Sequence, residues 1–154
     1  ARQRPRYSHP DDETRRDPVI TLFVTNIILD KRRRRIMALG VTLVLALIIT
    51  LLTLLPVSAP QGVPGTDKAH HLLGFAALTL PSALLYPRSL VIVLPCSLLF
   101  GGAIELIQPY VGRQGEFADF SADAVGALVG VGVGLALRTV TIAVVARQRR
   151  RAST

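Results

Sequence analysis

Long apolar stretches alternate with short polar segments along this chain. The apolar stretch at residues 36–55 (IMALGVTLVLALIITLLTLL) contains 20 residues and no charge. As a helix it would be about 30 Å long, which matches the hydrocarbon core of a bilayer. Similar stretches cover residues 69–86, 89–108 and 119–146, with Pro-containing turns between them. Because backbone groups in lipid must be hydrogen-bonded, the pattern predicts an all-α integral membrane bundle of four transmembrane helices.

A shorter apolar segment precedes the first predicted span. Asp17 and Pro18 are typical of a helix start, and a largely apolar run of 11 residues follows at 19–29. This run is too short to cross a bilayer, so we expect a short interfacial amphipathic helix that ends in a basic cluster against anionic lipid headgroups. An apolar strip covered by a partner protein is the alternative. The predicted domains are a polar N-terminal tail (1–17), the interfacial helix and basic cluster (18–35), a four-helix transmembrane domain (36–146) and a basic tail (147–154).

Charge is concentrated at the two ends of the chain. Half of the 154 residues are hydrophobic and 18% are charged, with a mean hydropathy of +0.45. Residues 1–35 carry a net charge of +5 and residues 147–154 one of +4, whereas the residues between them carry −1. A nucleic-acid-binding domain would spread Lys and Arg over its folded surface, so this distribution argues against a nucleic-acid partner. Basic residues favour the cytoplasmic ends of membrane helices, which predicts that both termini are cytoplasmic.

The predicted topology brings the acidic residues of the middle region to the outer face of the membrane. Pairs spaced three or four residues apart share one face of a helix. Asp67 and His71 form such a pair where the second span opens, and Asp119 and Asp123 form another where the fourth begins. We call the whole candidate ligand-binding set the polar cluster. It comprises Asp67, Lys68, His71, Glu105, Gln108, Arg113, Asp119 and Asp123.

Small residues recur at every fourth position of the fourth span. They are Ala122, Gly126, Gly130 and Gly134. Such a ridge permits close approach of a second helix, and at 100° per residue it lies near the side of the two aspartates. We therefore expect these carboxylates to face protein, and Gly132 to lie on the opposite side of the helix.

Two segments resemble the VanZ-like family of small multi-pass bacterial membrane proteins. TDKAHHLLGF resembles the DKxxH element of that family, with Asp67, Lys68 and His71 at the matching positions. ELIQPYVGRQGEFADFSADAVG resembles the second element, ExxQ followed by Arg and DxxxNxxG; the matching residues are Glu105, Gln108, Arg113, Asp119 and Gly126. Asp123 stands where the family usually has Asn. The resemblance covers roughly residues 36–138, and it implies a bacterial inner-membrane protein, since some members confer glycopeptide (teicoplanin) resistance.

Metal binding and catalysis have weaker support in the sequence. His70 and His71 are possible metal ligands together with Asp67, Glu105 and Asp119, but their spacing is not a known ligand motif, so we assign no metal and no cofactor. The chain has no GxSxG element, and the catalytic residues, if any, are unknown. A network of ion pairs that only holds the helices together is the structural alternative to a binding site.

Three functions follow from these observations. The first is a VanZ-like membrane protein whose outer-face polar cluster binds an envelope component. The second is an accessory subunit packed among other membrane protein subunits, suggested by the small-residue ridge and the extra amphipathic segment. The third is an enzyme that acts on a lipid-linked substrate. The sequence does not name the ligand, the partner or the reaction.

Overall fold

The structure, a computed structural model, describes residues 30–54 and 66–152. This part of the chain is helical and contains no strand, which confirms the predicted all-α class. The predicted polar tail and interfacial helix lie outside the described residues, except that Asp30 is described. The elements are α2 (Lys31–Leu54), α3 (Thr66–Leu85), η1 (Pro87–Ser89), α4 (Leu90–Ile107), η2 (Gln108–Val111) and α5 (Phe117–Ala152).

Three of these helical stretches are long and apolar enough to cross a membrane: Lys31–Leu54, Pro87–Val111 and Phe117–Gln148. The predicted first, third and fourth spans coincide with them. Helix α3 has 20 residues but is not among the three, and its first two turns carry Asp67, Lys68, His70 and His71.

Helix α2 begins earlier than the apolar stretch that predicted it. Asp30 precedes the helix, and its carboxylate accepts a hydrogen bond from the backbone N–H of Arg32 at 2.8 Å, as an N-cap residue does. The basic residues 31–35 are therefore the first turns of α2 itself. Lys and Arg are good helix formers, so the helix continues through them without a break.

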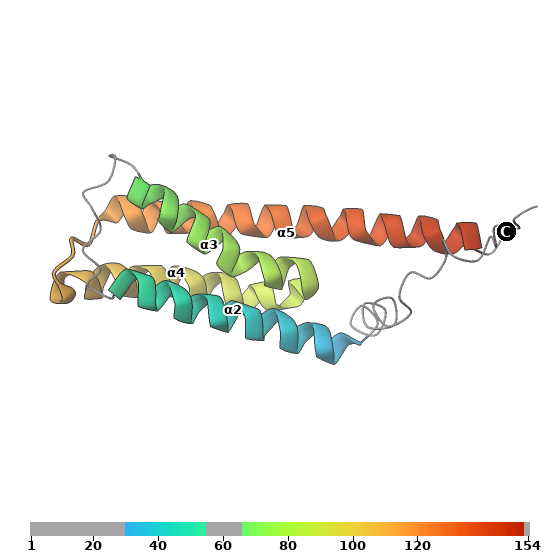
Figure 1. Cartoon of the computed structure of the whole chain (residues 1–154), viewed down its shortest axis with the longest axis horizontal. Helices are drawn as coiled ribbons and strands as arrows, with labels where there is room; N and C mark the ends of the chain where they lie inside the picture. Colours follow the sequence, from blue (N-terminus) through green and yellow to red (C-terminus); the bar gives the residue numbers. More distant parts are fainter. Residues whose placement is uncertain (1–29, 55–65, 153–154) are drawn as a thin grey trace, which may run out of the picture.

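Helix α3 is the centre of the bundle and packs against α2, α4 and α5 (Figure 1). The buried core contains Phe75 and Leu78 of α3, Ile104 of α4 and Ala127 of α5. Large apolar side chains on the outer surface are exposed, as lipid-facing residues would be; Val91 is 81% exposed and Leu99 74%. An apolar exterior around a small core is the arrangement expected of a bundle whose solvent is lipid.

The small residues of α5 lie directly against α3. A Cβ added at Gly126 would collide with the carbonyl of Leu72, and one at Gly130 with the carbonyl of Ala76. The contact residues lie four positions apart in both helices and in the same order, so α3 and α5 run parallel. A hydrogen bond from Thr79 Oγ1 to the Ala127 carbonyl, at 2.8 Å, joins the same two helices.

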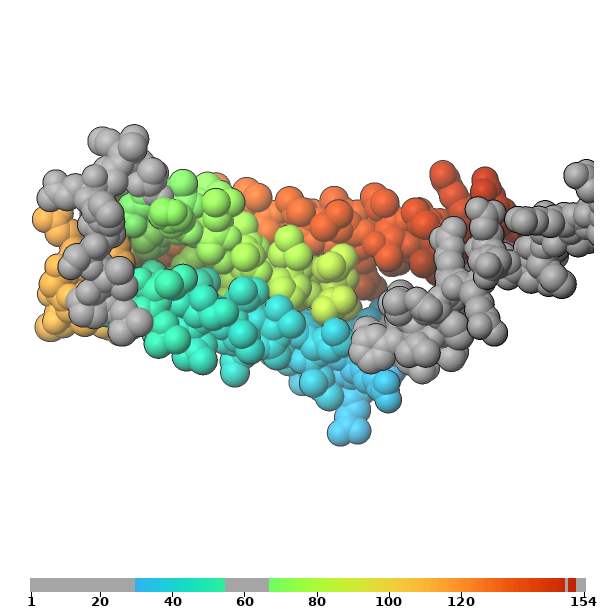
Figure 2. All heavy atoms as spheres, in the orientation of Figure 1, coloured from blue at the N-terminus to red at the C-terminus, as the bar shows by residue number. Residues whose placement is uncertain are grey.

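Consecutive helices alternate in direction, so the helix ends collect at two opposite ends of the bundle (Figure 1). The start of α2 and the end of α5, which carry the basic residues, lie at one end (Figure 2). The starts of α3 and α5 and the end of α4 lie at the other. The acidic residues of the middle region belong to this second end.

Candidate functional site

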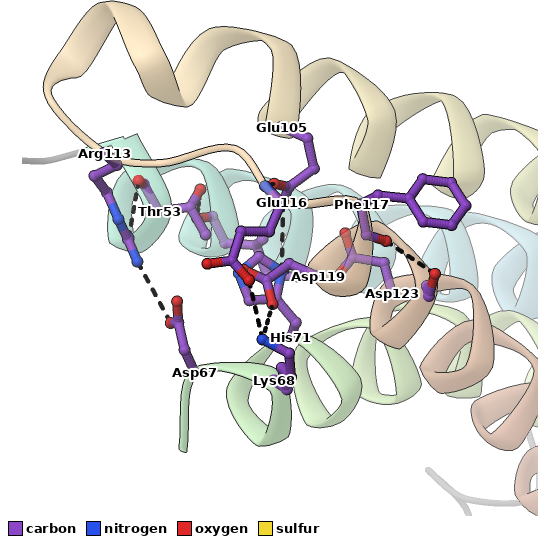
Figure 3. Close-up of polar contacts among 12 residues, drawn as sticks. Thr53, Asp67, Lys68, His71, Glu105, Arg113, Glu116, Phe117, Asp119 and Asp123 are labelled. Carbon is purple, nitrogen blue, oxygen red and sulfur yellow. Dashed lines mark hydrogen bonds and ion pairs between the residues drawn. The ribbon is translucent and has the colours of Figure 1, made fainter. Parts of the chain in front are cut away.

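The polar cluster forms where α3 and α5 begin and α4 ends (Figure 3). Helix α3 contributes Asp67, Lys68 and His71, α4 contributes Glu105, and α5 contributes Asp119 and Asp123. Gln108 and Arg113 come from η2 and the connection to α5. The structure thus brings together all eight residues of the set, drawn from sequence positions up to 56 apart.

The innermost part of the cluster is a group of three side chains, which we call the inner trio: His71, Glu105 and Asp123. His71 Nδ1 lies 2.9 Å from Asp123 Oδ1 and 3.9 Å from Glu105 Oε1. The side chains of His71 and Asp123 are 3% and 0% exposed, and that of Glu105 is 10% exposed. Three helices therefore meet through ionisable groups in a region shielded from solvent.

A glycine makes room for the Asp123 carboxylate. Gly101 lies one turn before Glu105 on α4, and a Cβ added there would lie 2.8 Å from Asp123 Oδ2 and 3.2 Å from the Phe75 ring. Any larger residue would displace the carboxylate or the ring. Gly101 and Glu105 lie on one face of α4, and the space above Gly101 is filled by the Asp123 carboxylate of α5.

A second, more exposed group surrounds the inner trio. We call it the outer layer: Asp67, Lys68, Arg113 and Glu116. Lys68 Nζ donates to Glu116 Oε2 at 3.1 Å and lies 3.5 Å from Asp119 Oδ1. The hydrogen bond to Glu116 and the charges of Asp119 and Glu116 raise the pKa of Lys68, so this residue is a cation at physiological pH.

Arg113 connects the outer layer to α2. Its guanidinium donates to Asp67 Oδ1 at 3.4 Å and to the backbone carbonyl of Thr53 at 3.2 Å. Thr53 lies in the last turn of α2, whose final carbonyls have no partner within the helix. Arg113 therefore caps the C-terminus of α2 and links it by hydrogen bonds to the start of α3.

The connection between η2 and α5 folds back over α4 and holds one oxygen of Glu105. The backbone N–H of Glu116 donates to Glu105 Oε2 at 2.8 Å. In the amide orientation that satisfies its neighbours, buried Gln108 also donates to Glu105 Oε2, at 3.1 Å. Gly115 lies so close to the Glu105 carbonyl that a Cβ would collide with it, and Gly112 adopts φ +79°, which favours glycine.

Several buried polar atoms of the cluster have no hydrogen-bond partner within the described residues. They are His71 Nε2, Glu105 Oε1, Asp119 Oδ1 and Asp123 Oδ2. Buried polar groups in folded proteins are usually paired, so a concentration of such atoms is typical of a site that receives a ligand, an ion or water. Two sets could hold a metal, because their ligand atoms lie within 4.8 Å of one another: Asp67, His71 and Asp119, and the inner trio.

The predicted set of eight residues leaves out three contributors to this end of the bundle. Glu116 forms an ion pair with Lys68, the Thr53 carbonyl accepts a hydrogen bond from Arg113, and Gly101 leaves room for the Asp123 carboxylate. Glu116 had a signal, since it lies between Arg113 and Asp119, two members of that set. The roles of Thr53 and Gly101 depend on contacts between helices and have no local pattern. His70, a possible metal ligand in the sequence, is exposed and lies outside both metal-capable sets.

Comparison of the chain with protein-family models, curated proteins and solved structures gives no match. The function must therefore be argued from the site and from the sequence pattern.

Proposed function

We propose that this chain is a four-span membrane protein whose polar cluster binds the polar headgroup of an envelope component. The observation that carries the proposal is the gathering of charged side chains from three helices at one end of an apolar bundle. Charges at membrane depth are costly and usually serve a function. Lys68 and Arg113 are 48% and 34% exposed, so their cationic groups are accessible to an anionic headgroup from the aqueous side.

The proposed orientation places the polar cluster at the outer face of a bacterial inner membrane. Support comes from the basic residues at 31–35 and 147–151, which lie at the opposite end of the bundle and favour the cytoplasm. In this arrangement α3 is the fourth span, parallel to α5 and largely enclosed by its neighbours. The exposed polar residues of its first turn would then lie at the aqueous surface of the membrane, and only His71 would be enclosed by protein.

The resemblance to the VanZ-like family supports a role in the cell envelope of the glycopeptide-resistance type. All residues that carry the resemblance, apart from Gly126, lie in the polar cluster. Asp123, where the family usually has Asn, contacts His71, so the departure adds a carboxylate to the inner trio. We propose on this basis that the cluster is the functional site.

The length of α5 supports a second candidate, an accessory subunit of a larger membrane assembly. Its 36 residues extend over roughly 54 Å, well beyond the thickness of the hydrocarbon core. Figure 1 shows its C-terminal part projecting past the end of α3 and the start of α4. Purification in mild detergent tests this candidate: co-purifying subunits that are lost when residues 1–30 are deleted support it, and a chain that migrates alone excludes it.

Charge-removing variants of the outer layer test the headgroup proposal. In cells that depend on this chain for glycopeptide resistance, Lys68→Gln and Arg113→Gln should abolish resistance, because a headgroup anion loses its cationic partner. Arg88→Gln, an exposed arginine at the opposite end, is the matched control and should keep it. Membrane abundance and thermal melting in detergent are measured for all three. Wild-type resistance in Lys68→Gln and Arg113→Gln would refute the proposal.

A further inference from the structure

We propose that His71, Glu105 and Asp123 together bind a divalent first-row transition-metal cation, with zinc as the ion that best fits the donors. The inference goes beyond the proposed function, because it concerns the inner trio and does not depend on which envelope component, if any, contacts the outer layer. Each step below rests on the geometry of these three side chains.

The donors are those that such a cation prefers. Imidazole and carboxylate are both zinc ligands, and three protein ligands would leave a fourth position open, as in catalytic zinc sites. An imidazole also favours a transition metal over Mg²⁺ or Ca²⁺, which are bound mainly by oxygen ligands. The three residues come from α3, α4 and α5, so a bound ion would join the three helices of the core.

The distances suit an ion between the three groups. His71 Nδ1 lies 2.9 Å from one Asp123 oxygen and 3.9 Å from one Glu105 oxygen. Ligand atoms about 2.0–2.2 Å from a zinc ion lie roughly 3–3.5 Å from one another in a tetrahedral site. The observed distances bracket this range, so small side-chain rotations would complete the site. Binding through Nδ1 would replace the His71–Asp123 hydrogen bond, and the neutral imidazole would then carry its proton on Nε2.

The unpartnered atoms are an independent indication of a ligand. Glu105 Oε1 has no hydrogen-bond partner among the residues that the structure describes, although Glu105 Oε2 accepts from the N–H of Glu116 and from Gln108. The hydrogen bonds to Oε2 thus fix the orientation of the Glu105 carboxylate, and Oε1 faces the His71 imidazole. Outer hydrogen bonds that fix a ligating carboxylate in this way are typical of metal sites.

Charge balance also favours a cation. Glu105, Asp119 and Asp123 lie close together in the interior, and Lys68 is the cation in contact with one of them, Asp119. Carboxylates that lie so close together repel one another as anions, and this is costly where water is scarce unless a cation lies among them. A divalent cation would neutralise Glu105 and Asp123.

The other metal-capable set is the weaker candidate. It shares His71 with the inner trio but uses Asp67 and Asp119, which already interact with Arg113 and Lys68. An ion there would have to compete with a guanidinium and an ammonium group. Asp67 is also 57% exposed, whereas the members of the inner trio are at most 10% exposed.

Zinc binding by the full chain tests the inference. The protein carries an affinity tag without histidine, is purified in mild detergent, stripped with a chelator, incubated with Zn²⁺ and desalted. Mass spectrometry of the metal should then find about one zinc ion per chain. His71→Gln, Glu105→Gln and Asp123→Asn should each weaken the affinity by at least about 10-fold.

Matched variants locate the ion. His70→Gln removes the adjacent exposed histidine, and Asp67→Asn removes the exposed carboxylate of the competing set; both should bind zinc like the wild type. Loss of zinc in Asp67→Asn with retention in Glu105→Gln would assign the ion to the other set and overturn the inference. Retention in His71→Gln would overturn it as well, because both sets need this imidazole.

A readout on the wild-type chain guards against variants that fail to fold. Co²⁺ added to the stripped protein should give visible absorption bands, which one equivalent of Zn²⁺ abolishes, and Zn²⁺ should raise the melting temperature more than Mg²⁺ does. Absence of both effects would refute the metal site. It would leave the headgroup proposal intact, because Lys68→Gln and Arg113→Gln test that proposal through resistance.

Discussion

At the scale of single residues, the position of the Asp123 carboxylate depends on a glycine in the neighbouring helix. Asp123 Oδ2 occupies space that a side chain at Gly101 would take, and the Phe75 ring closes the same space from α3. Interiors are packed tightly enough that one added methyl group must move its neighbours. Moving this carboxylate would lengthen its 2.9 Å contact with His71.

Gly101→Ala should therefore destabilise the bundle by about 1–3 kcal/mol through overpacking and should weaken any ligand bound by the inner trio. The adjacent Gly102→Ala is the matched control, because its Cβ would lie 3.8 Å from the Phe120 ring, an ordinary contact. Thermal unfolding in detergent and zinc affinity are measured for both variants. Equal effects at the two positions would show that the space at Gly101 is not what positions Asp123.

At the scale of elements, the small-residue face of α5 brings the polar cluster together. Gly126 and Gly130 let the α5 backbone approach that of α3. In the two turns that precede Gly126, this parallel packing sets Asp123 beside His71 and Asp119 beside Lys68. A wider separation of the helices would draw the carboxylates of α5 away from α3.

Substitution of the ridge glycines tests this packing. Gly126→Leu and Gly130→Leu should lower thermal stability strongly, since leucine would collide with the α3 backbone, and should weaken binding at the polar cluster as the helices separate. Gly132→Leu should have little effect, because nothing lies within 4 Å of an added Cβ there. Comparable losses at all three positions in thermal unfolding experiments would contradict the assigned packing face.

Much of the fold was predictable because lipid restricts the chain to regular helices. The uncharged run 36–55 and the apolar stretch 89–108 correspond closely to α2 and α4. The ends of the elements were harder to predict, since α2 extends back through 31–35 and α5 continues to Ala152. Hydropathy marks where a helix enters lipid, but a helix can continue beyond the lipid as long as its residues favour it.

The candidate site was predictable in its membership and less so in its pairings. Helical spacing put Asp119 and Asp123 on one face, and topology put them at the depth of His71. Lys68 pairs with Glu116, and Arg113 with Thr53, because the connection between η2 and α5 folds back over α4. The hydrophobic periodicity of the sequence does not predict this fold of the connection. Hydrogen bonds between residues 48 and 60 positions apart are a product of helix packing.

At the scale of the whole molecule, the two ends of the bundle differ in charge. One end holds the polar cluster, and the other holds the basic start of α2 and the basic end of α5 (Figure 2). Such asymmetry orients a membrane protein, because Lys and Arg near the ends of the spans are retained in the cytoplasm. This asymmetry supports our central proposal, that the bundle spans the membrane and presents its polar cluster at the outer face.

Labelling of matched cysteines in intact cells tests that claim most directly. Gln114→Cys lies beside the polar cluster and Gln148→Cys near the basic end of α5; both positions are exposed, and both variants carry Cys96→Ser. A membrane-impermeant thiol reagent should label Gln114→Cys in intact cells and Gln148→Cys only after permeabilisation. Labelling of Gln148→Cys in intact cells, with Gln114→Cys protected until permeabilisation, would contradict the account.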